Sequence, residues 1–71
     1  MVKQEEIGAI IKERRLNERV SLEDLAALTG VGINTLSRLE RGVGNTRLNV
    51  LLTVTNALGL RLTVTPNNNL N

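Results

Sequence analysis

Two short apolar segments separated by a glycine-rich tetrapeptide dominate the middle of this chain. Apolar residues recur at helical spacing in both segments: Leu25, Ala26 and Leu28, then Ile33, Leu36 and Leu39. Between them, residues 29–32 read Thr-Gly-Val-Gly, and glycine lets a chain change direction sharply. Residues 21–42 are therefore predicted to form two short helices joined by a tight turn, an arrangement whose second helix can enter a DNA major groove.

Further helices are predicted on both sides of this unit. Isoleucines and a leucine at helical spacing predict an amphipathic helix over residues 5–19, with arginine on its polar face. Ser21 followed by Asp24 matches a helix N-terminus, so a second helix is expected over residues 22–29, ending at Gly30. A third is expected from residue 32 or 33 to residue 41, ended by Gly42. A fourth is expected from residue 48 to the stop at Gly59.

Two features of the C-terminal third predict a homodimer. Val50 and Val54 extend the apolar surface of the fourth helix beyond the stripe that one core requires, which indicates contact with a second subunit. Residues 60–65 then alternate apolar and polar side chains, the period of a β-strand. A single strand cannot pair its backbone within a helical domain, so we expect it to pair with its copy in a second chain.

Composition excludes several classes of function. The 71 residues, enough for one domain, contain no cysteine, histidine or aromatic residue, so disulfides, a zinc site, other metal sites and a cofactor are not expected. The commonest catalytic base and nucleophile are missing, which argues against an enzyme. Without aromatic side chains to stack on bases, single-stranded nucleic acid is a disfavoured ligand. Nine Lys+Arg against seven Asp+Glu, a net charge of +2, is compatible with double-stranded DNA.

The chain contains no apolar run long enough for a membrane span, and its first residues lack the profile of a signal peptide. We therefore expect a cytoplasmic protein.

Three segments together resemble a known family: IGAIIKERR, SLEDLAALTGVGINTLSRLERG and LNVLLTVTNALGLRLTV. They are similar to Xre-type helix-turn-helix regulators related to phage repressors, and most similar to HipB-like antitoxins. The resemblance covers residues 7–64. It implies an all-α, lambda-repressor-like fold of four to five helices with a short C-terminal β-strand that pairs across a homodimer. We expect one domain over residues 1–65, with the dimerisation strand at about 60–65, and a disordered polar tail over residues 66–71.

The resemblance also implies roles for individual residues. Base-reading residues would be Gly32, Ile33, Asn34, Thr35, Ser37 and Arg38. Positions that contact DNA phosphates would be Ser21, Leu22, Arg41 and Asn45. Arg15 and Glu40 would form a structural ion pair. Adding the observations on the C-terminal third, the dimer interface would be formed by Val50, Val54, Leu60, Leu62 and Val64.

The chemistry of these residue types suits the implied roles. Asparagine pairs with adenine and arginine with guanine, while the methyl groups of Ile33 or Thr35 could pack on a thymine methyl. The alternatives are that Asn34 and Thr35 only cap the helix start, and that Arg38 is a solvated surface charge. Two positions depart from the family pattern: Leu22 replaces a glutamine that would bond a phosphate, and Gly32 replaces a serine or threonine.

Three functions follow as hypotheses. The first is a dimeric repressor of palindromic operators that is also the antitoxin of a HipBA-type pair, repressing its own operon and binding a HipA-like kinase toxin. The second is a stand-alone Xre-family regulator. The third is a protein-interaction module that has lost DNA reading, which the departures at Leu22 and Gly32 motivate.

Overall fold

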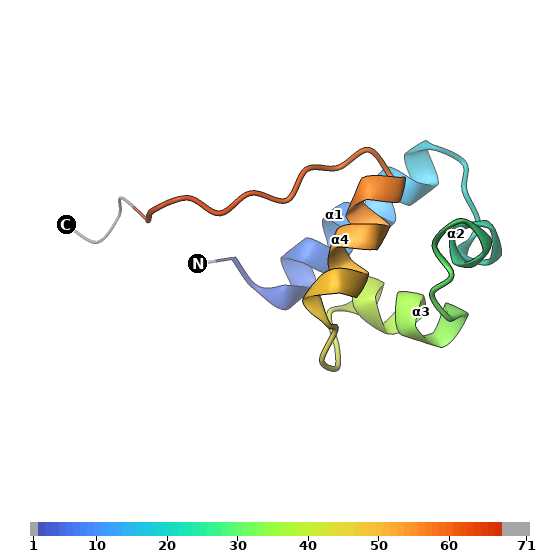
Figure 1. Ribbon diagram of the computed structural model, residues 1–71, viewed down its shortest axis with the longest axis horizontal. Coiled ribbons are helices and arrows are strands. Elements are labelled where there is room, and N and C mark those ends of the chain that lie inside the picture. The colour runs from blue at the N-terminus through green and yellow to red at the C-terminus, as the bar shows by residue number, and fades with distance from the viewer. Residues whose placement is uncertain (1, 68–71) are drawn as a thin grey trace.

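The computed structural model describes residues 2–67, and within them the chain forms four helices (Figure 1). Their bounds are α1 Gln4–Asn17, α2 Leu22–Thr29, α3 Ile33–Arg41 and α4 Leu48–Ala57. Helix α1 packs against α3, and α2 packs against both α3 and α4. The sequence predicted the positions of all four helices. Of the four to five helices expected, four are found in the described residues.

Both ends of α2 are fixed by local capping, and the second cap makes the turn into α3. The Ser21 hydroxyl accepts the backbone N–H of Asp24 at 3.0 Å, and the Asp24 carboxylate accepts the N–H of Ser21 at 3.4 Å, which makes a capping box. At the other end of α2, Gly30 has a φ of 73°, a left-handed conformation that favours glycine, and its N–H bonds to the Ala26 carbonyl. The chain is thereby turned so that α3 begins directly after Gly32, its N-cap residue.

All helices contribute to one small core. Its buried apolar side chains are Ile11, Leu25, Leu36, Leu39, Val54 and Leu58. Close approach of α1 to α3 is possible because Gly8 lacks a side chain. A Cβ at residue 8 would lie 2.5 Å from the Glu40 carbonyl oxygen and overlap the Leu39 carbonyl oxygen as well. The distance between these two helices is thus limited by backbone rather than by side chains.

The orientation of α4 corrects one prediction about the dimer interface. Val54 has no exposed surface and lies in the core, and Val50 is half-buried against that core. Val54 was therefore wrongly assigned to an interface between subunits. The exposed apolar residues of α4 are instead Leu48 and Leu52, at 64% and 45% exposure. Two neighbouring apolar rows run along this helix, and packing against the other helices decides which of them faces inward.

The C-terminal segment, residues 58–67, leaves α4 at the end farthest from the α3–α4 loop and runs away from the helices (red in Figure 1). Its start is held in place: the Arg14 Nε donates to the Leu58 carbonyl at 2.7 Å, and the Leu60 N–H bonds to the Thr55 carbonyl at 2.8 Å. Residues 61–67 form neither helix nor strand in this single chain. Because the predicted strand would pair with a second chain, it stays a prediction. The predicted disordered tail lies largely outside the described residues, at 68–71.

Candidate nucleic-acid interface

Helix α3 has one buried and one exposed side. Leu36, Leu39 and Glu40 are buried, while the opposite side carries Asn34, Arg38 and Arg41, all exposed. The helical period separates these two sets by about half a turn. The burial of one side and the exposure of the other therefore follow from the sequence. Leucines at i and i+3 face the core, and polar residues at the other positions face outward.

The six predicted base-reading residues lie together at the exposed surface of α3. Gly32, Ile33, Asn34, Thr35 and Arg38 are exposed, and Ser37 is half-buried. Ile33 is 43% exposed, so its apolar side chain is not part of the core. Helix α3 itself lies along the lower edge of the molecule in Figure 1, beside the α3–α4 loop. Its exposed surface carries amide, hydroxyl, guanidinium and apolar groups, the types that distinguish base edges in a major groove.

A buried ion pair ties the back of α3 to α1. Arg15 donates from Nε to Glu40 Oε2 at 2.6 Å and from Nη2 to Oε1 at 3.0 Å, while its Nη1 bonds to the Val20 carbonyl at 2.9 Å. The two side chains are only 9% and 5% exposed. The hydrogen bond with Glu40 raises the pKa of the Arg15 guanidinium above its ordinary value, so Arg15 stays charged. The structure thus contains the ion pair that the resemblance implied, and it orients α3.

The predicted phosphate-contacting residues are placed unequally. Ser21, Arg41 and Asn45 are exposed. The Ser21 oxygen already accepts the Asp24 N–H, but its hydroxyl hydrogen remains available to donate. Leu22 is half-buried and packs against the core, which explains an apolar residue at this position. Only its backbone N–H is left for a phosphate.

Charge is distributed unevenly over this surface. Glu23 and Asp24 occupy the first turn of α2, next to Ser21. Arg38 and Arg41 lie on α3, and Arg47 is the exposed N-cap residue of α4. The positive side of the interface is consequently α3 and the loop after it. Arg47 was given no role in the sequence analysis; the structure shows it as an exposed arginine at the end of the α3–α4 loop.

Other kinds of site find no support in the residues that the structure describes. Among them, no group of three or more His, Cys, Asp or Glu side chains could hold a metal ion. Within residues 2–67, no helix combines the length and apolar character needed to cross a membrane.

Comparison with known proteins agrees with this geometry. The family model HTH_3, described as helix-turn-helix, matches residues 11–64, which span the second half of α1, all of α2 to α4 and most of the C-terminal segment. No curated protein matches the chain. Because the match covers about three quarters of the sequence, the chain belongs to the helix-turn-helix family HTH_3, a family of DNA-binding transcriptional regulators.

Proposed function

We propose that this protein is a sequence-specific repressor that binds double-stranded DNA as a homodimer, with the start of α3 in the major groove. The observation that supports this most is the exposed polar surface of α3, backed by the core and by the Arg15–Glu40 pair. A reading helix must be held rigidly, because small displacements misalign hydrogen bonds to base edges. In this fold the Arg15–Glu40 pair and two buried leucines hold α3 from behind.

Each residue on that surface has a role in the proposed complex. Asn34 and Arg38 would hydrogen-bond to bases, and Ile33 would contact a thymine methyl group. Arg41, Asn45 and Ser21 would bond phosphates on the two sides of the groove. With few phosphate contacts per subunit, affinity would depend strongly on pairing two subunits on one palindrome, whose half-sites lie about 34 Å apart.

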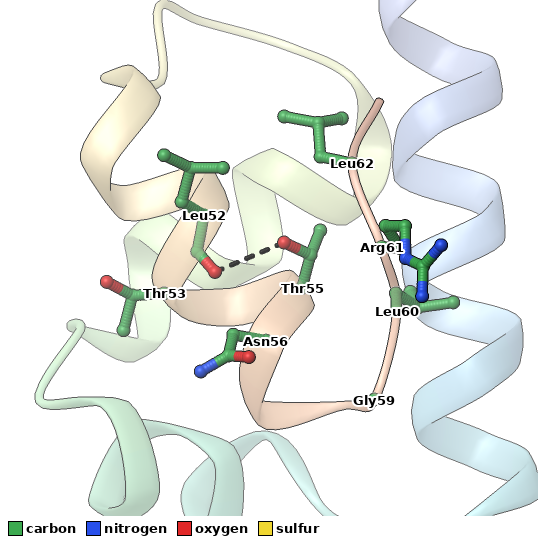
Figure 2. Close-up of a pocket in the computed structure, with 8 residues that line it drawn as sticks. All are labelled: Leu52, Thr53, Thr55, Asn56, Gly59, Leu60, Arg61 and Leu62. Carbon is green, nitrogen blue, oxygen red and sulfur yellow. Dashed lines mark hydrogen bonds between the residues drawn. The ribbon is translucent and has the colours of Figure 1, made fainter. Parts of the chain in front are cut away.

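Exposed apolar side chains on α1, α4 and the C-terminal segment support the homodimer. We define the dimer face as Ile10, Leu48, Leu52, Leu62 and Val64, each between 38% and 96% exposed. Figure 2 shows residues 59–62 running beside α4, with Leu62 on the side of Leu52 and Leu60 directed toward α1. The backbone groups of residues 61–66 form no hydrogen bond with another described residue.

A second copy of the chain is the occupant that fits this face. Its own residues 60–65 carry the same alternation, so two segments related by a two-fold axis could pair their backbones and bury Leu62 and Val64. A domain of 71 residues also buries a small core, so that burying this face adds stability that one subunit lacks. Leu60 is half-buried against the core and would support the segment rather than form the centre of the interface.

Within this function, we propose the role of a HipB-like antitoxin that represses its own operon and binds a HipA-like kinase toxin. The support for this finer assignment is the resemblance of residues 7–64 to those antitoxins. A stand-alone regulator would have the same DNA-binding surface and the same dimer face, so DNA binding alone does not separate the two roles.

DNA binding is tested by titrating the protein against the DNA upstream of its own gene, using fluorescence anisotropy at two salt concentrations. We expect specific binding to an inverted repeat, weakened about tenfold or more by Arg38→Ala and by Asn34→Ala. Lys12→Ala, which removes an exposed charge from α1, is the matched control and should change affinity much less. Equal affinity for the repeat and for scrambled DNA would contradict the proposal and favour a protein-interaction module.

The antitoxin role is tested by co-purification with the product of the neighbouring gene. A stable complex with a kinase would support it. Specific operator binding without such a complex would contradict the antitoxin role and leave the stand-alone regulator.

A further inference from the structure

The guanidinium of Arg38 lies over Gly44 of the α3–α4 loop. A Cβ built at residue 44 would lie 2.6 Å from Arg38 Nη2, 3.1 Å from Nε and 3.2 Å from Cζ. The space that a side chain at residue 44 would take is therefore occupied by the arginine head group. Gly44 also has a φ of 80°, a backbone conformation that residues with a side chain rarely adopt. Glycine at residue 44 is therefore favoured for two reasons: its backbone conformation, and the space beside it that the Arg38 guanidinium fills.

The loop that carries Gly44 is anchored to α1. Gln4 Nε2 donates a hydrogen bond to the Gly44 carbonyl oxygen at 2.8 Å, across 40 residues of sequence. Next to it, a Cβ at Gly42 would lie 2.5 Å from the Cα of Glu5, so the backbones of the loop and of the α1 start are in direct contact. The Val43 N–H closes the end of α3 by bonding to the Arg38 carbonyl at 3.0 Å.

From this arrangement we infer that Gln4 and Gly44 are positioning residues for DNA recognition, which act by directing the Arg38 side chain. An arginine on an exposed helix face has many rotamers, and ordering them on binding costs conformational entropy. The backbone at Gly44 limits the rotamers of Arg38 before DNA binds. The hydrogen bond from Gln4 keeps the loop that carries Gly44 at a constant distance from α3. This inference rests on the proposed function, because it requires Arg38 to contact DNA.

A double-mutant cycle tests the inference. Four proteins are compared by operator affinity: the unmodified chain, Gly44→Ala, Arg38→Ala and the double variant. Gly44→Ala should weaken binding about three- to tenfold, because its methyl group displaces the guanidinium. In the Arg38→Ala background the same substitution should change affinity less than about twofold, since the side chain that it displaces is gone.

Backbone strain at residue 44 is controlled separately. Gly30→Ala places a methyl group at a similar φ of 73° with no atom within 4 Å, so its loss of thermal stability measures the strain alone. Gln4→Ala is a second, milder route to the same effect, since Gln4 is exposed and leaves the core untouched. It should weaken binding about two- to threefold, again only when Arg38 is present.

The outcomes distinguish this inference from the function on which it rests. If Gly44→Ala and Gln4→Ala weaken binding equally with and without Arg38, or leave it unchanged in the Arg38 background, the positioning role is overturned while specific DNA binding stands. If Arg38→Ala itself leaves operator affinity unchanged, the recognition role of Arg38 is overturned, and the positioning role with it.

Discussion

Arg15 of α1 and Glu40 of α3 form two parallel hydrogen bonds, at 2.6 and 3.0 Å, in a place almost closed to solvent. Both residues carry charges that are costly to bury alone, and each makes the burial of the other possible. The pair lies on the side of α3 opposite to the surface that we assign to DNA. Its contribution to function is therefore the orientation of a helix and not contact with the ligand.

Removing one partner of this pair should be strongly destabilising. Glu40→Ala leaves a charged guanidinium buried with only the Val20 carbonyl as acceptor, and we expect a loss of about 3 kcal/mol in the free energy of unfolding. Urea denaturation followed by circular dichroism measures it. The double variant Arg15→Met with Glu40→Leu removes both charges and should recover most of that loss. If the double variant is no more stable than Glu40→Ala, the loss of stability does not come from the unpaired charge of Arg15.

Gly8→Ala should destabilise the protein although alanine favours helix. The gain in helix propensity is about 1 kcal/mol, but the added methyl group meets carbonyl oxygens of α3 that cannot move without displacing the helix. We expect a net loss of about 1–3 kcal/mol in thermal unfolding. Ala9→Gly, at the exposed neighbouring position of α1, isolates the propensity term and should cost about 1 kcal/mol. Unchanged or increased stability of Gly8→Ala would contradict the close packing of α1 on α3.

Gly32→Ser should stabilise α3. Gly32 has a φ of −64° and open space around its missing Cβ, and its helix has no side-chain N-cap. A serine there can accept a free N–H of the first turn, which together with reduced freedom of the unfolded chain should add about 0.5 kcal/mol. Differential scanning calorimetry would show this as a rise of a few degrees in Tm. Ser21→Ala, which removes the existing cap of α2, should shift Tm in the opposite direction.

The dimer face can be tested by charge. Leu62→Lys combined with Val64→Lys should weaken self-association and operator binding together, because two cations would meet their copies across the two-fold axis. Sedimentation equilibrium measures the first effect. The matched control is Thr63→Lys combined with Thr65→Lys, which adds the same charge at the alternate positions of the segment. A tight dimer in the first variant would contradict the proposed interface.

Leu22→Gln should exchange stability for DNA affinity. The leucine side chain is half-buried against the core, so a polar replacement should cost about 1 kcal/mol of stability. Glutamine at the N-terminus of α2 can donate to a phosphate, so operator affinity should rise about two- to fivefold. Leu22→Ala is the control that loses packing without adding a donor. If Leu22→Gln binds no better than Leu22→Ala, α2 does not lie against the DNA backbone as proposed.

Local signals were sufficient for the helices and for the exposed side of α3. Ser21, Gly30 and Gly42 mark helix ends through interactions of neighbouring residues, which is why the bounds of α2 and α3 could be predicted closely. The exposure of Asn34 and Arg38 follows in the same way from the positions of Leu36 and Leu39. The pairing of Arg15 with Glu40 came from the family resemblance, since two charges 25 residues apart carry no local signal of contact.

The amino-acid sequence by itself determined the four helices, the turn and the polar character of the reading surface, because these depend on residues a few positions apart. Only the tertiary structure decided which apolar row of α4 is buried, since Val54 and Leu52 are both apolar, and the core formed with the other helices buries Val54 and leaves Leu52 exposed. It also decided that Leu22 belongs to the core side and that Gly44 lies under Arg38. Such relationships depend on distances between helices, and those distances arise from close contacts like that of Gly8 with α3, which no periodicity in the chain encodes.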